Sequence, residues 1–395
     1  MRDVTAEVRE FYEHYPYPPP IESLDRQRPQ QDVTHRRRAE YHLLWPARPF
    51  RENFSILVAG CGTSQAAKYA LRWPAARIVG IDISAASIES TIRLQCRHQL
   101  ANLDARELPL ERVRELGKQF DLIVCTGVLH HLADPDAGLA ALREVLAPGG
   151  AMHLMVYAPY GRRGIYVLQE FCRRLGLTAN DTDIRDLVSA LRLLPAGHPL
   201  ETLLRHAPDF RDAAALADAL LHPRDRAYSV PEALRFVQDA GLAFGRWIRQ
   251  APYSPCCGVL ARLPLTSRFA NLPLPSQYAA AELFRGTMIR HSLIAHDDDG
   301  GGRGTRIDFA TADWKEYVPI RVPDTVCVHE RLPDRVAGIL INRNHTFTDL
   351  LLPLSEDEHR WFDAIDGVRR AGEIGAPREF MERLWWYDQV VFAIG

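Results

Sequence analysis

The chain is poor in cysteine and methionine, and it lacks an excess of charge of either sign. Its 395 residues include 7 cysteines and 5 methionines. The cysteines are scattered, without the spacing of a metal site or a disulfide framework, so we expect reduced thiols and no metal ligation in a cytosolic protein. Lys and Arg number 48 against 50 for Asp and Glu. This balance disfavours a nucleic-acid partner, which would require a basic surface.

The chain also lacks a long apolar run. Its first residues, Met-Arg-Asp-Val-Thr-Ala-Glu, contain no apolar signal core, and no segment approaches the roughly 20 apolar residues of a membrane span. Hydrophobic residues make up 47% and charged residues 25% of the sequence, which is the profile of a globular protein with two or three domains. We therefore expect no membrane partner and a cytoplasmic location.

Short apolar runs alternate with helical stretches in the first half of the chain. Runs that are hydrophobic almost throughout are typical of strands buried on both faces of a parallel sheet. We expect an α/β fold with a doubly wound, mostly parallel, seven-stranded sheet. The predicted strands are 54–59, 77–81, a run from about 102, 120–125, 151–157, 242–249 and 256–262, and the helices between the early strands are 64–72, 84–98 and 135–146.

The remaining segments predict additions to this domain. We expect an N-terminal arm over residues 1–50 and an α/β domain over 51–263, with a Leu/Ala/Arg-rich helical cap inserted at about 160–225. Residues 264–305, rich in Pro and Gly at both ends, suggest a linker. Residues 306–395 predict a small α+β domain, in which a helix, a turn, a helix and a strand faintly resemble winged-helix modules that hold peptide leaders; packing or dimerisation, as in a homodimer, is the simpler interpretation.

A glycine-rich turn follows the first predicted strand and opens a helix. Glycines at 60 and 62 allow positive φ angles and let a ligand touch the backbone, and the helix N-terminus favours a polar or anionic group. Asp82 closes the next predicted strand, where a carboxylate can accept both hydroxyls of a ribose. The turn and the acid together predict a site for a ligand that carries a nucleoside.

Two further absences exclude other ligands that carry a nucleoside. A dinucleotide fingerprint requires a glycine at position 65, where this chain has Gln65, and no Gly-Lys-Ser/Thr is present to hold a triphosphate. The sequence instead resembles class I S-adenosylmethionine-dependent methyltransferases of the small-molecule type. The resemblance rests on four blocks, Ala59-Gly60-Cys61-Gly62-Thr63, Gly80-Ile81-Asp82-Ile83-Ser84, residues 120–132 and Leu142-Arg143-Glu144-Val145-Leu146-Ala147-Pro148-Gly149-Gly150.

The resemblance implies a Rossmann-like methyltransferase fold, S-adenosyl-L-methionine as cofactor, and a set of cofactor-binding residues. Gly60, Cys61 and Gly62 would meet the methionine part, Asp82 the ribose and Thr126 the methionine amine. Backbone around Leu110, with Glu111 as a possible contributor, would hold the adenine, and Asp104 would be a strand residue. Members of the family usually carry an acidic residue two positions before the first glycine, whereas this chain has Val58 at that position. The remaining cofactor contacts that we expect come from Gln65, Ile83 and Gly127.

Methyl transfer requires positioning and exclusion of water, and it needs a base only when the acceptor arrives protonated. His130, His131 and Tyr157 are the candidate catalytic residues, and a structural role for both histidines is an equally weighted alternative. Aromatic side chains of the arm and of the segment after the fifth strand can form a substrate pocket. The candidate substrate-binding residues are Tyr15, Tyr17, Tyr160 and Tyr166.

The expected function is methyl transfer from S-adenosylmethionine to a small-molecule or peptide-borne acceptor. A cofactor-binding regulatory or scaffold protein without turnover is an alternative, supported by Val58. RNA methylation is a third, disfavoured by the near-neutral charge. The loop after the fourth predicted strand lacks Asn/Asp-Pro-Pro-Tyr, which argues against methylation of adenine or amide nitrogens.

Overall fold

The computed structural model describes residues 4–27, 33–201, 213–297 and 307–394. The chain divides into two compact units. The first comprises Met1–Arg28, Asn53–Leu242 and Gly286–Ser292, and the second comprises Pro29–Glu52, Ala243–Arg285 and Leu293–Gly395. The predicted arm is therefore divided, because residues from Pro29 onward group with the second unit.

The structure contains a seven-stranded sheet, as the alternating pattern predicts, and most of its strands lie in the first unit. Its strand order is β3-β2-β1-β4-β5-β7-β6, and β1 lies parallel to both β2 and β4, so that Val58 is opposite Gly80 and Val124. The carboxyl ends of these strands meet at one edge of the sheet, which is where open α/β sheets bind ligands. The strands are β1 Ser55–Ala59, β2 Arg77–Asp82, β3 Leu103–Glu107, β4 Phe120–Thr126, β5 Leu146–Tyr157, β6 Leu242–Trp247 and β7 Arg290–Asp297.

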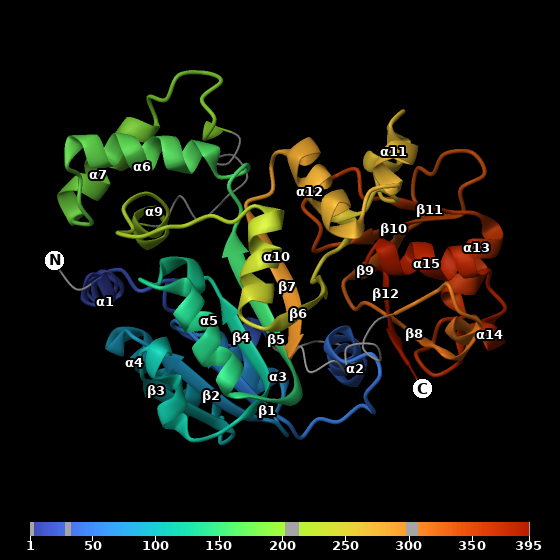
Figure 1. Ribbon diagram of the computed structural model, residues 1–395, viewed down its shortest axis with the longest axis horizontal. Helices are drawn as coiled ribbons and strands as arrows, with labels where there is room; N and C mark the ends of the chain where they lie inside the picture. The colour runs from blue at the N-terminus through green and yellow to red at the C-terminus, as the bar shows by residue number, and fades with distance from the viewer. Residues whose placement is uncertain (1–3, 28–32, 202–212, 298–306, 395) are drawn as a thin grey trace. The chain divides into compact units, whose positions relative to one another are not determined.

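Helices cover the sheet where the sequence predicts them. Helices α5 (Pro135–Glu144) and α10 (Val230–Asp239) pack together in front of the strands in Figure 1. Helices α3 (Gln65–Arg72) and α4 (Ala85–His98) also pack against each other. Ser84 caps α4 by accepting a hydrogen bond from the Ser87 amide. Caps of this kind satisfy amides that would otherwise lack partners and fix where each helix begins.

The prediction of a strand at 256–262 is wrong. Residues Leu260–Arg262 form a short 3-10 helix, and β7 at Arg290–Asp297 completes the sheet instead. Within this stretch Gly258 has φ +58°, a left-handed conformation that interrupts the extended backbone of a strand. The predicted linker at 264–305 is also wrong over its described part, because it holds α11 (Thr266–Ala270), α12 (Leu274–Arg285) and β7. Residues 298–306 lie outside the described residues.

The helical cap follows β5 as predicted. It contains α6 (Arg163–Leu175), α7 (Asp181–Leu191) and α9 (Ala213–Leu220), while its residues 202–212 lie outside the described part of the chain. The chain leaves the sheet after Tyr157 and returns at Ala227, which bridges to Tyr157 in parallel. This return brings the end of the cap back to the edge of the sheet where β5 ends.

The described part of the arm, residues 4–27, docks on the first unit. Helix α1 (Val4–His14) lies between α4 and the cap in Figure 1. Glu13 accepts hydrogen bonds from the Ala85 amide at 2.6 Å and the Ala86 amide at 3.3 Å, so a carboxylate lies at the positive N-terminus of α4. Phe11 packs into the apolar core of the cap.

The second unit contains two small antiparallel sheets, with strand orders β11-β10-β9 and β12-β8. The helix, turn, helix and strand predicted near the C-terminus are present, while the resemblance to winged-helix modules and a role in dimerisation stay predictions. No helix within the described ranges is long and apolar enough to cross a membrane. The main elements are α2 Val33–Leu44, β8 Val318–Arg321, β9 Thr325–Val328, β10 Gly338–Asn342, β11 Leu352–Leu354, α13 Glu356–Asp363, α14 Ala371–Ile374, α15 Arg378–Trp386 and β12 Val390–Ala393.

Candidate active site

A cavity of about 610 Å³ opens at the carboxyl edge of the sheet in the first unit. The glycine-rich turn lines one part of it, and residues of the arm and cap line another. All nine predicted cofactor-binding residues line this cavity, and so do three of the other predicted site residues. The predicted residues that line it are Gly60, Cys61, Gly62, Gln65, Asp82, Ile83, Leu110, Thr126, Gly127, Tyr17, His131 and Tyr157.

The turn after β1 requires glycine at two positions. Gly60 has φ +69°, and a Cβ there would lie 2.1 Å from a Val128 methyl carbon. Gly62 has φ +54°, and a Cβ there would lie 3.0 Å from the carbonyl oxygen of Tyr17. Both the left-handed backbone and the close neighbours exclude a side chain. The turn therefore presents bare backbone to the cavity and is covered by the arm at Tyr17.

Asp82 links the turn to the end of β2. Its Oδ2 accepts a hydrogen bond from the Gly62 amide at 2.8 Å, and its Oδ1 accepts one from the Ser84 amide at 3.0 Å. Burial raises the pKa of the Asp82 carboxyl, although these amide hydrogen bonds oppose that effect. Each oxygen retains a lone pair that can accept a further hydrogen bond from a ligand hydroxyl.

A second polar contact joins α3 to β4. Gln65 Nε2 donates to Thr126 Oγ1 at 2.8 Å, so the side chain in place of a third glycine is part of the cavity wall. Val58 is fully buried in β1 and lies outside this wall. Leu110 and Glu111 line the cavity. Asp104 instead pairs with Arg106 at the surface, in agreement with its expected position as a strand residue.

His131 presents one ring nitrogen as an acceptor. Its Nδ1 lies 2.6 Å from the carbonyl oxygen of Arg224, and because a carbonyl can only accept, Nδ1 carries the hydrogen. Nε2 of the neutral ring then has the lone pair. The contact with Arg224 forms because the chain returns from the cap next to β5. Long-range folding thus fixes the tautomer of a side chain that lines the cavity.

The structure does not place His130, a candidate catalytic residue, in the cavity wall. The side chain is fully buried and does not line the cavity, and neither ring nitrogen has a hydrogen-bond partner. Burial, followed by the neighbouring His131, lowers the pKa of His130 well below its ordinary value. The ring packs against Tyr157, with the centroids 3.9 Å apart. His130 is therefore a neutral packing residue, enclosed because the short 3-10 helix Leu129–His131 turns it inward.

A buried carboxylate, Asp218 of α9, lies opposite the turn in the cavity wall. Tyr12 of the arm donates to its Oδ1 at 3.0 Å, and Tyr157 donates to its Oδ2 at 3.5 Å. Burial raises the pKa of Tyr157 well above its ordinary value, so this phenol is a hydrogen-bond donor rather than a base at neutral pH. No sequence pattern pointed to Asp218, because its helix carries no motif and meets the arm only in the folded chain.

Asp218, His131 and His222 have candidate ligand atoms within 4.8 Å of one another. His222 Nδ1 accepts a hydrogen bond from the Arg224 amide at 3.0 Å, so its Nε2 carries the hydrogen in the neutral ring. The group therefore offers one imidazole lone pair and one carboxylate, with a second imidazole as donor. This donor set fits the transfer of a proton better than the ligation of a metal ion, which requires lone pairs.

An ion pair closes the base of the cap. Arg162 lies 2.7 Å from the carboxylate of Asp225, with side-chain exposures of 7% and 2%. The guanidinium carbon lies 3.5 Å from the ring centroid of Tyr157. Charged residues at the end of the cap would ordinarily form a surface pair, but here the pair is buried and supports the Tyr157 ring.

The structure does not place Tyr15, Tyr160 and Tyr166, the other predicted substrate-binding residues, in the cavity wall. Tyr15 is held by Asp181 at the surface, and Tyr166 accepts a hydrogen bond from Arg162. Tyr12, which lies within α1, lines the cavity and was not predicted.

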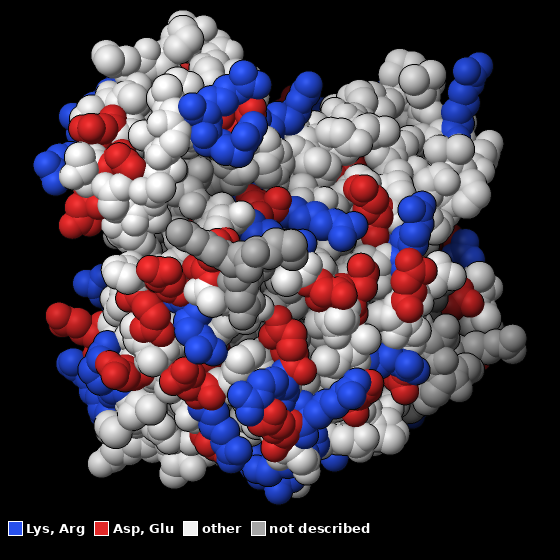
Figure 2. Space-filling model, turned by 60° about the vertical axis from the view of Figure 1, so that its left-hand side comes forward, with Lys and Arg blue, Asp and Glu red and all other residues white. Residues whose placement is uncertain are grey.

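The surface charge agrees with the balanced composition. Figure 2 shows Lys and Arg side chains interspersed with Asp and Glu on the face in view, without a continuous basic band. A nucleic-acid-binding face would concentrate positive charge along the path of the phosphates. This face gives no support for RNA as the acceptor.

Comparison with known proteins identifies the fold and the chemistry. Residues 57–152 match a family model described as a methyltransferase domain. An uncharacterized protein of Synechococcus sp. is 33% identical over 289 residues, which cover 71% of this chain and 69% of that protein. A ubiquinone biosynthesis O-methyltransferase of Chelativorans sp. is 32% identical over 181 residues, 46% of this chain and 63% of that enzyme.

The fold extends the similarity to almost the whole chain. The structure of PKMT2 from Rickettsia typhi in complex with AdoHcy superposes with a TM-score of 0.61 at 16% identity, covering 96% of this chain and 77% of that one. At this identity the likeness concerns the fold, which is the one expected from the four sequence blocks. With the matching domain model and the curated relative that shares most of its length, this chain belongs to the class I S-adenosylmethionine-dependent methyltransferases.

Proposed function

We propose that this methyltransferase acts on a nitrogen or oxygen of a small-molecule or peptide-borne acceptor and that His131 accepts the proton which the acceptor loses. One observation carries the proposal. His131 lines the same cavity as the glycine-rich turn, and its Nδ1 is held by the Arg224 carbonyl, which leaves Nε2 as the proton acceptor. A base at this point is needed if the acceptor is protonated at neutral pH.

The cavity wall fits S-adenosylmethionine by its chemistry. Gly60 and Gly62 offer backbone that no side chain could share, and we assign them, with Cys61, to the methionine part. Asp82 retains a lone pair on each oxygen for the two ribose hydroxyls. Thr126 and Gln65 form a polar pair at the end of β4 for the amine end of the cofactor. When bound, the cofactor supplies a methyl group on a sulfonium centre, which is a good leaving group.

The residues of this chain then have three tasks. The arm and the cap exclude water from the cavity and hold the acceptor in line with the methyl group. His131 Nε2 takes the proton from a hydroxyl oxygen as that atom forms its bond to the methyl carbon. It takes the proton from an ammonium nitrogen before transfer, because the protonated nitrogen has no lone pair with which to attack the methyl carbon. Asp218 lies close to the resulting imidazolium and stabilises its positive charge.

The charge beside His131 favours an amine as the acceptor. The charge of Arg162 is balanced by Asp225, which leaves the Asp218 carboxylate to attract a cation. The aromatic ring of Tyr12 at this carboxylate adds a negative face that attracts an ammonium group. A primary ammonium group would be held by Asp218 and deprotonated by His131 before methyl transfer.

A hydroxyl acceptor is the second candidate, favoured by the relatives that are named ubiquinone biosynthesis O-methyltransferases. These share 31–32% identity over parts of the chain. The same base would serve a phenol, whereas Asp218 would then contribute little to acceptor affinity. Replacement of Asp218 by Asn therefore distinguishes the two acceptor classes.

The test is single-turnover transfer of labelled methyl groups to matched panels of amines, phenols and short peptides. His131→Ala is expected to lower the rate of transfer by ~10²–10⁴-fold while the affinity for S-adenosylhomocysteine stays close to wild type. The loss should shrink at high pH, where the acceptor ionises unaided. His130→Gln is the matched control, and it is expected to lower stability rather than the rate of transfer at a temperature where the protein is folded.

Three results would contradict the proposal. Full activity of His131→Ala at neutral pH would show that His131 is not the base. Transfer to RNA but to no amine, phenol or peptide of the panels would show that the acceptor is a nucleic acid. Binding of S-adenosylhomocysteine by a wild-type chain that methylates no acceptor tested would favour a scaffold without turnover.

A further inference from the structure

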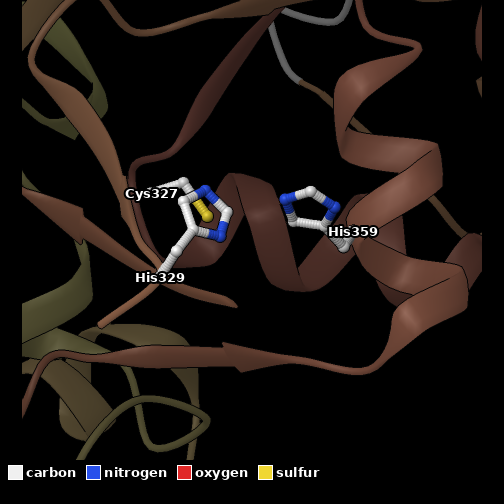
Figure 3. Close-up of side chains that lie close together, drawn as sticks. All are labelled: Cys327, His329 and His359. Carbon is white, nitrogen blue, oxygen red and sulfur yellow. The ribbon is translucent and has the colours of Figure 1, made fainter. Parts of the chain in front are cut away.

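A second group of potential ligand side chains lies in the second unit. Cys327, His329 and His359 have a sulfur or ring nitrogen within 4.8 Å of one another. Figure 3 shows His359 on a helix facing the strand that carries Cys327 and His329. The proposed methyl-transfer chemistry uses none of the three. These residues have no familiar ligand spacing in the sequence, because only folding brings His359 to the other two.

Strand geometry places the first two ligands together. Cys327 belongs to β9 and lies opposite Leu340 of β10, while His329 follows directly after the strand ends at Val328. Residues two apart in an extended chain point to the same side, so Cys327 and His329 share one face. Cys-x-His is therefore a preformed pair of ligands.

The third ligand comes from a well-anchored helix. Ser355 caps α13, and its side chain and Glu358 exchange hydrogen bonds in a capping box. His359 lies one turn into the helix, and its amide donates to the Ser355 carbonyl. The capping box fixes where the helix begins and therefore the turn on which His359 stands.

A glycine keeps the space between the ligands open. A Cβ at Gly338 would lie 2.7 Å from the Cys327 sulfur, 3.2 Å from a His359 ring carbon and 3.5 Å from a His329 ring carbon. The glycine has no positive φ, so backbone conformation does not require it here. The three ligands surround the point where any other residue would place its side chain.

Hydrogen-bond acceptors hold both imidazole rings through Nδ1. His359 Nδ1 lies 3.5 Å from Asp363 Oδ2, and His329 Nδ1 lies 3.3 Å from the Ala337 carbonyl oxygen. A hydrogen on Nδ1 leaves the lone pair on Nε2 of each ring. Carboxylates and carbonyls play this role for the histidine ligands of many metal sites, where they fix the tautomer and raise basicity.

We propose that Cys327, His329 and His359 bind one divalent transition-metal ion, with Zn²⁺ the best match. A thiolate and two imidazoles are ligands that zinc prefers, and hard ions such as Mg²⁺ and Ca²⁺ would select oxygen instead. Zinc–sulfur and zinc–nitrogen bonds of about 2.3 and 2.0 Å place tetrahedral ligand atoms about 3.5 Å apart. Small side-chain rotations achieve this from separations within 4.8 Å. The exposed side of His329 leaves the fourth position for water or another ligand.

The site would tie β9 to α13 within the second unit. An ion that binds the folded chain and not the unfolded one stabilises the fold in proportion to its concentration above the dissociation constant. The proposal therefore predicts a structural effect that can be measured without any methyl acceptor.

The experiment uses the full chain, freed of metal by a chelator and titrated with Co²⁺ and then Zn²⁺. Cobalt bound to a thiolate gives a sulfur-to-metal charge-transfer band in the near ultraviolet, and zinc should displace it. One equivalent of metal and this band are expected for the wild type and for Cys256→Ser, an exposed cysteine of the same unit. Cys327→Ser should abolish the band, and His359→Ala should weaken metal binding.

Asp363→Asn tests the role of the carboxylate beside His359. Loss of such a partner lowers metal affinity typically by about 10–100-fold, and circular dichroism of each metal-free variant checks that it folds. A wild-type chain without the band would overturn the proposal, and so would an unchanged band in Cys327→Ser. Metal bound without the band would place it on oxygen and nitrogen ligands elsewhere, such as His131, Asp218 and His222, and would also overturn it.

Discussion

Tyr12 and Asp218 are 206 residues apart in the sequence, and the tyrosine hydroxyl lies 3.0 Å from the aspartate Oδ1. The contact joins the arm to the cap across the cavity. Burial raises the pKa of both groups, so Tyr12 remains a donor. The Asp218 carboxylate is thus oriented by one phenol from the arm and a second from the end of β5. Closure of the active site and orientation of its acid depend on the same hydrogen bond.

Tyr12→Phe removes this hydrogen bond while keeping the ring. A hydrogen bond to a charged group is worth about 1.5–3 kcal/mol, so we expect acceptor affinity to fall by roughly 10-fold or more and amide exchange in residues 4–14 to accelerate. Tyr15→Phe is the matched control, because its hydroxyl contacts Asp181 outside the cavity. Equal effects of the two variants would show that the contact with Asp218 has no special role.

Asp82→Ala should weaken S-adenosylhomocysteine binding. Loss of charge-assisted hydrogen bonds to the ribose corresponds to about 1.5–3 kcal/mol, or roughly 10- to 150-fold in the dissociation constant. Asp104→Ala, on the neighbouring strand outside the cavity, should bind as the wild type does. Calorimetry measures both, and unchanged affinity in Asp82→Ala would remove the assignment to the ribose.

Asp225→Ala should destabilise the first unit strongly, because it leaves the buried Arg162 cation without its partner. Such losses are about 3–5 kcal/mol, whereas removal of both charges is far milder. We therefore expect Arg162→Met combined with Asp225→Leu to recover much of the free energy of unfolding in urea. Glu170→Ala, which breaks exposed pairs, should change it by less than about 1 kcal/mol. A double variant as unstable as Asp225→Ala would argue against a desolvated ion pair.

The arm should become more protected when the cofactor site is filled. The carbonyl of Tyr17 lies against Gly62, and Pro18 accepts a hydrogen bond from Thr63 at 2.8 Å, so the arm touches the turn that we assign to the cofactor. Segments that close over a ligand are drawn from the less stable parts of a fold. Hydrogen exchange of residues 4–20 should slow on addition of S-adenosylhomocysteine. The same exchange rate with and without it would mean that the arm only packs.

Stability should fall as the pH drops below about 6.5. Burial lowers the pKa of the His42 imidazole in the second unit from 6.5 to about 4. Between these two pH values His42 binds a proton in the unfolded chain but stays neutral in the folded chain. His42 alone then lowers the free energy of unfolding by up to about 1.4 kcal/mol per pH unit over this range, and His130 and His222, whose pKa values burial also lowers, add to the slope. His42→Gln should reduce the slope by its own share, and His14→Gln, an exposed histidine, should not. An unchanged slope in His42→Gln would contradict this origin.

Local patterns predicted the parts of the molecule in which one short segment specifies both structure and chemistry. The turn at Gly60 and Gly62 and the carboxylate at Asp82 were found because strand, turn, helix and acid follow one another at fixed spacing. The helix start at residue 84 was likewise readable, since capping depends on neighbours within four residues. The last strand was not, because the apolar run at 256–262 looks like a strand although Gly258 turns the backbone within it.

The sequence by itself therefore determined the sheet, the cofactor turn and the class of reaction, because these depend on contacts that are local or imposed by strand order. Only the tertiary structure decided which ring nitrogen of His131 is the acceptor, that His130 is buried, and that Tyr12 rather than Tyr15 reaches Asp218. Two of these depend on partners far away in the chain, at a separation of 93 residues for His131 and Arg224 and 206 residues for Tyr12 and Asp218. The type of a side chain determines which groups it can bind. Its actual partner and its protonation depend on which distant segments of the chain fold against it.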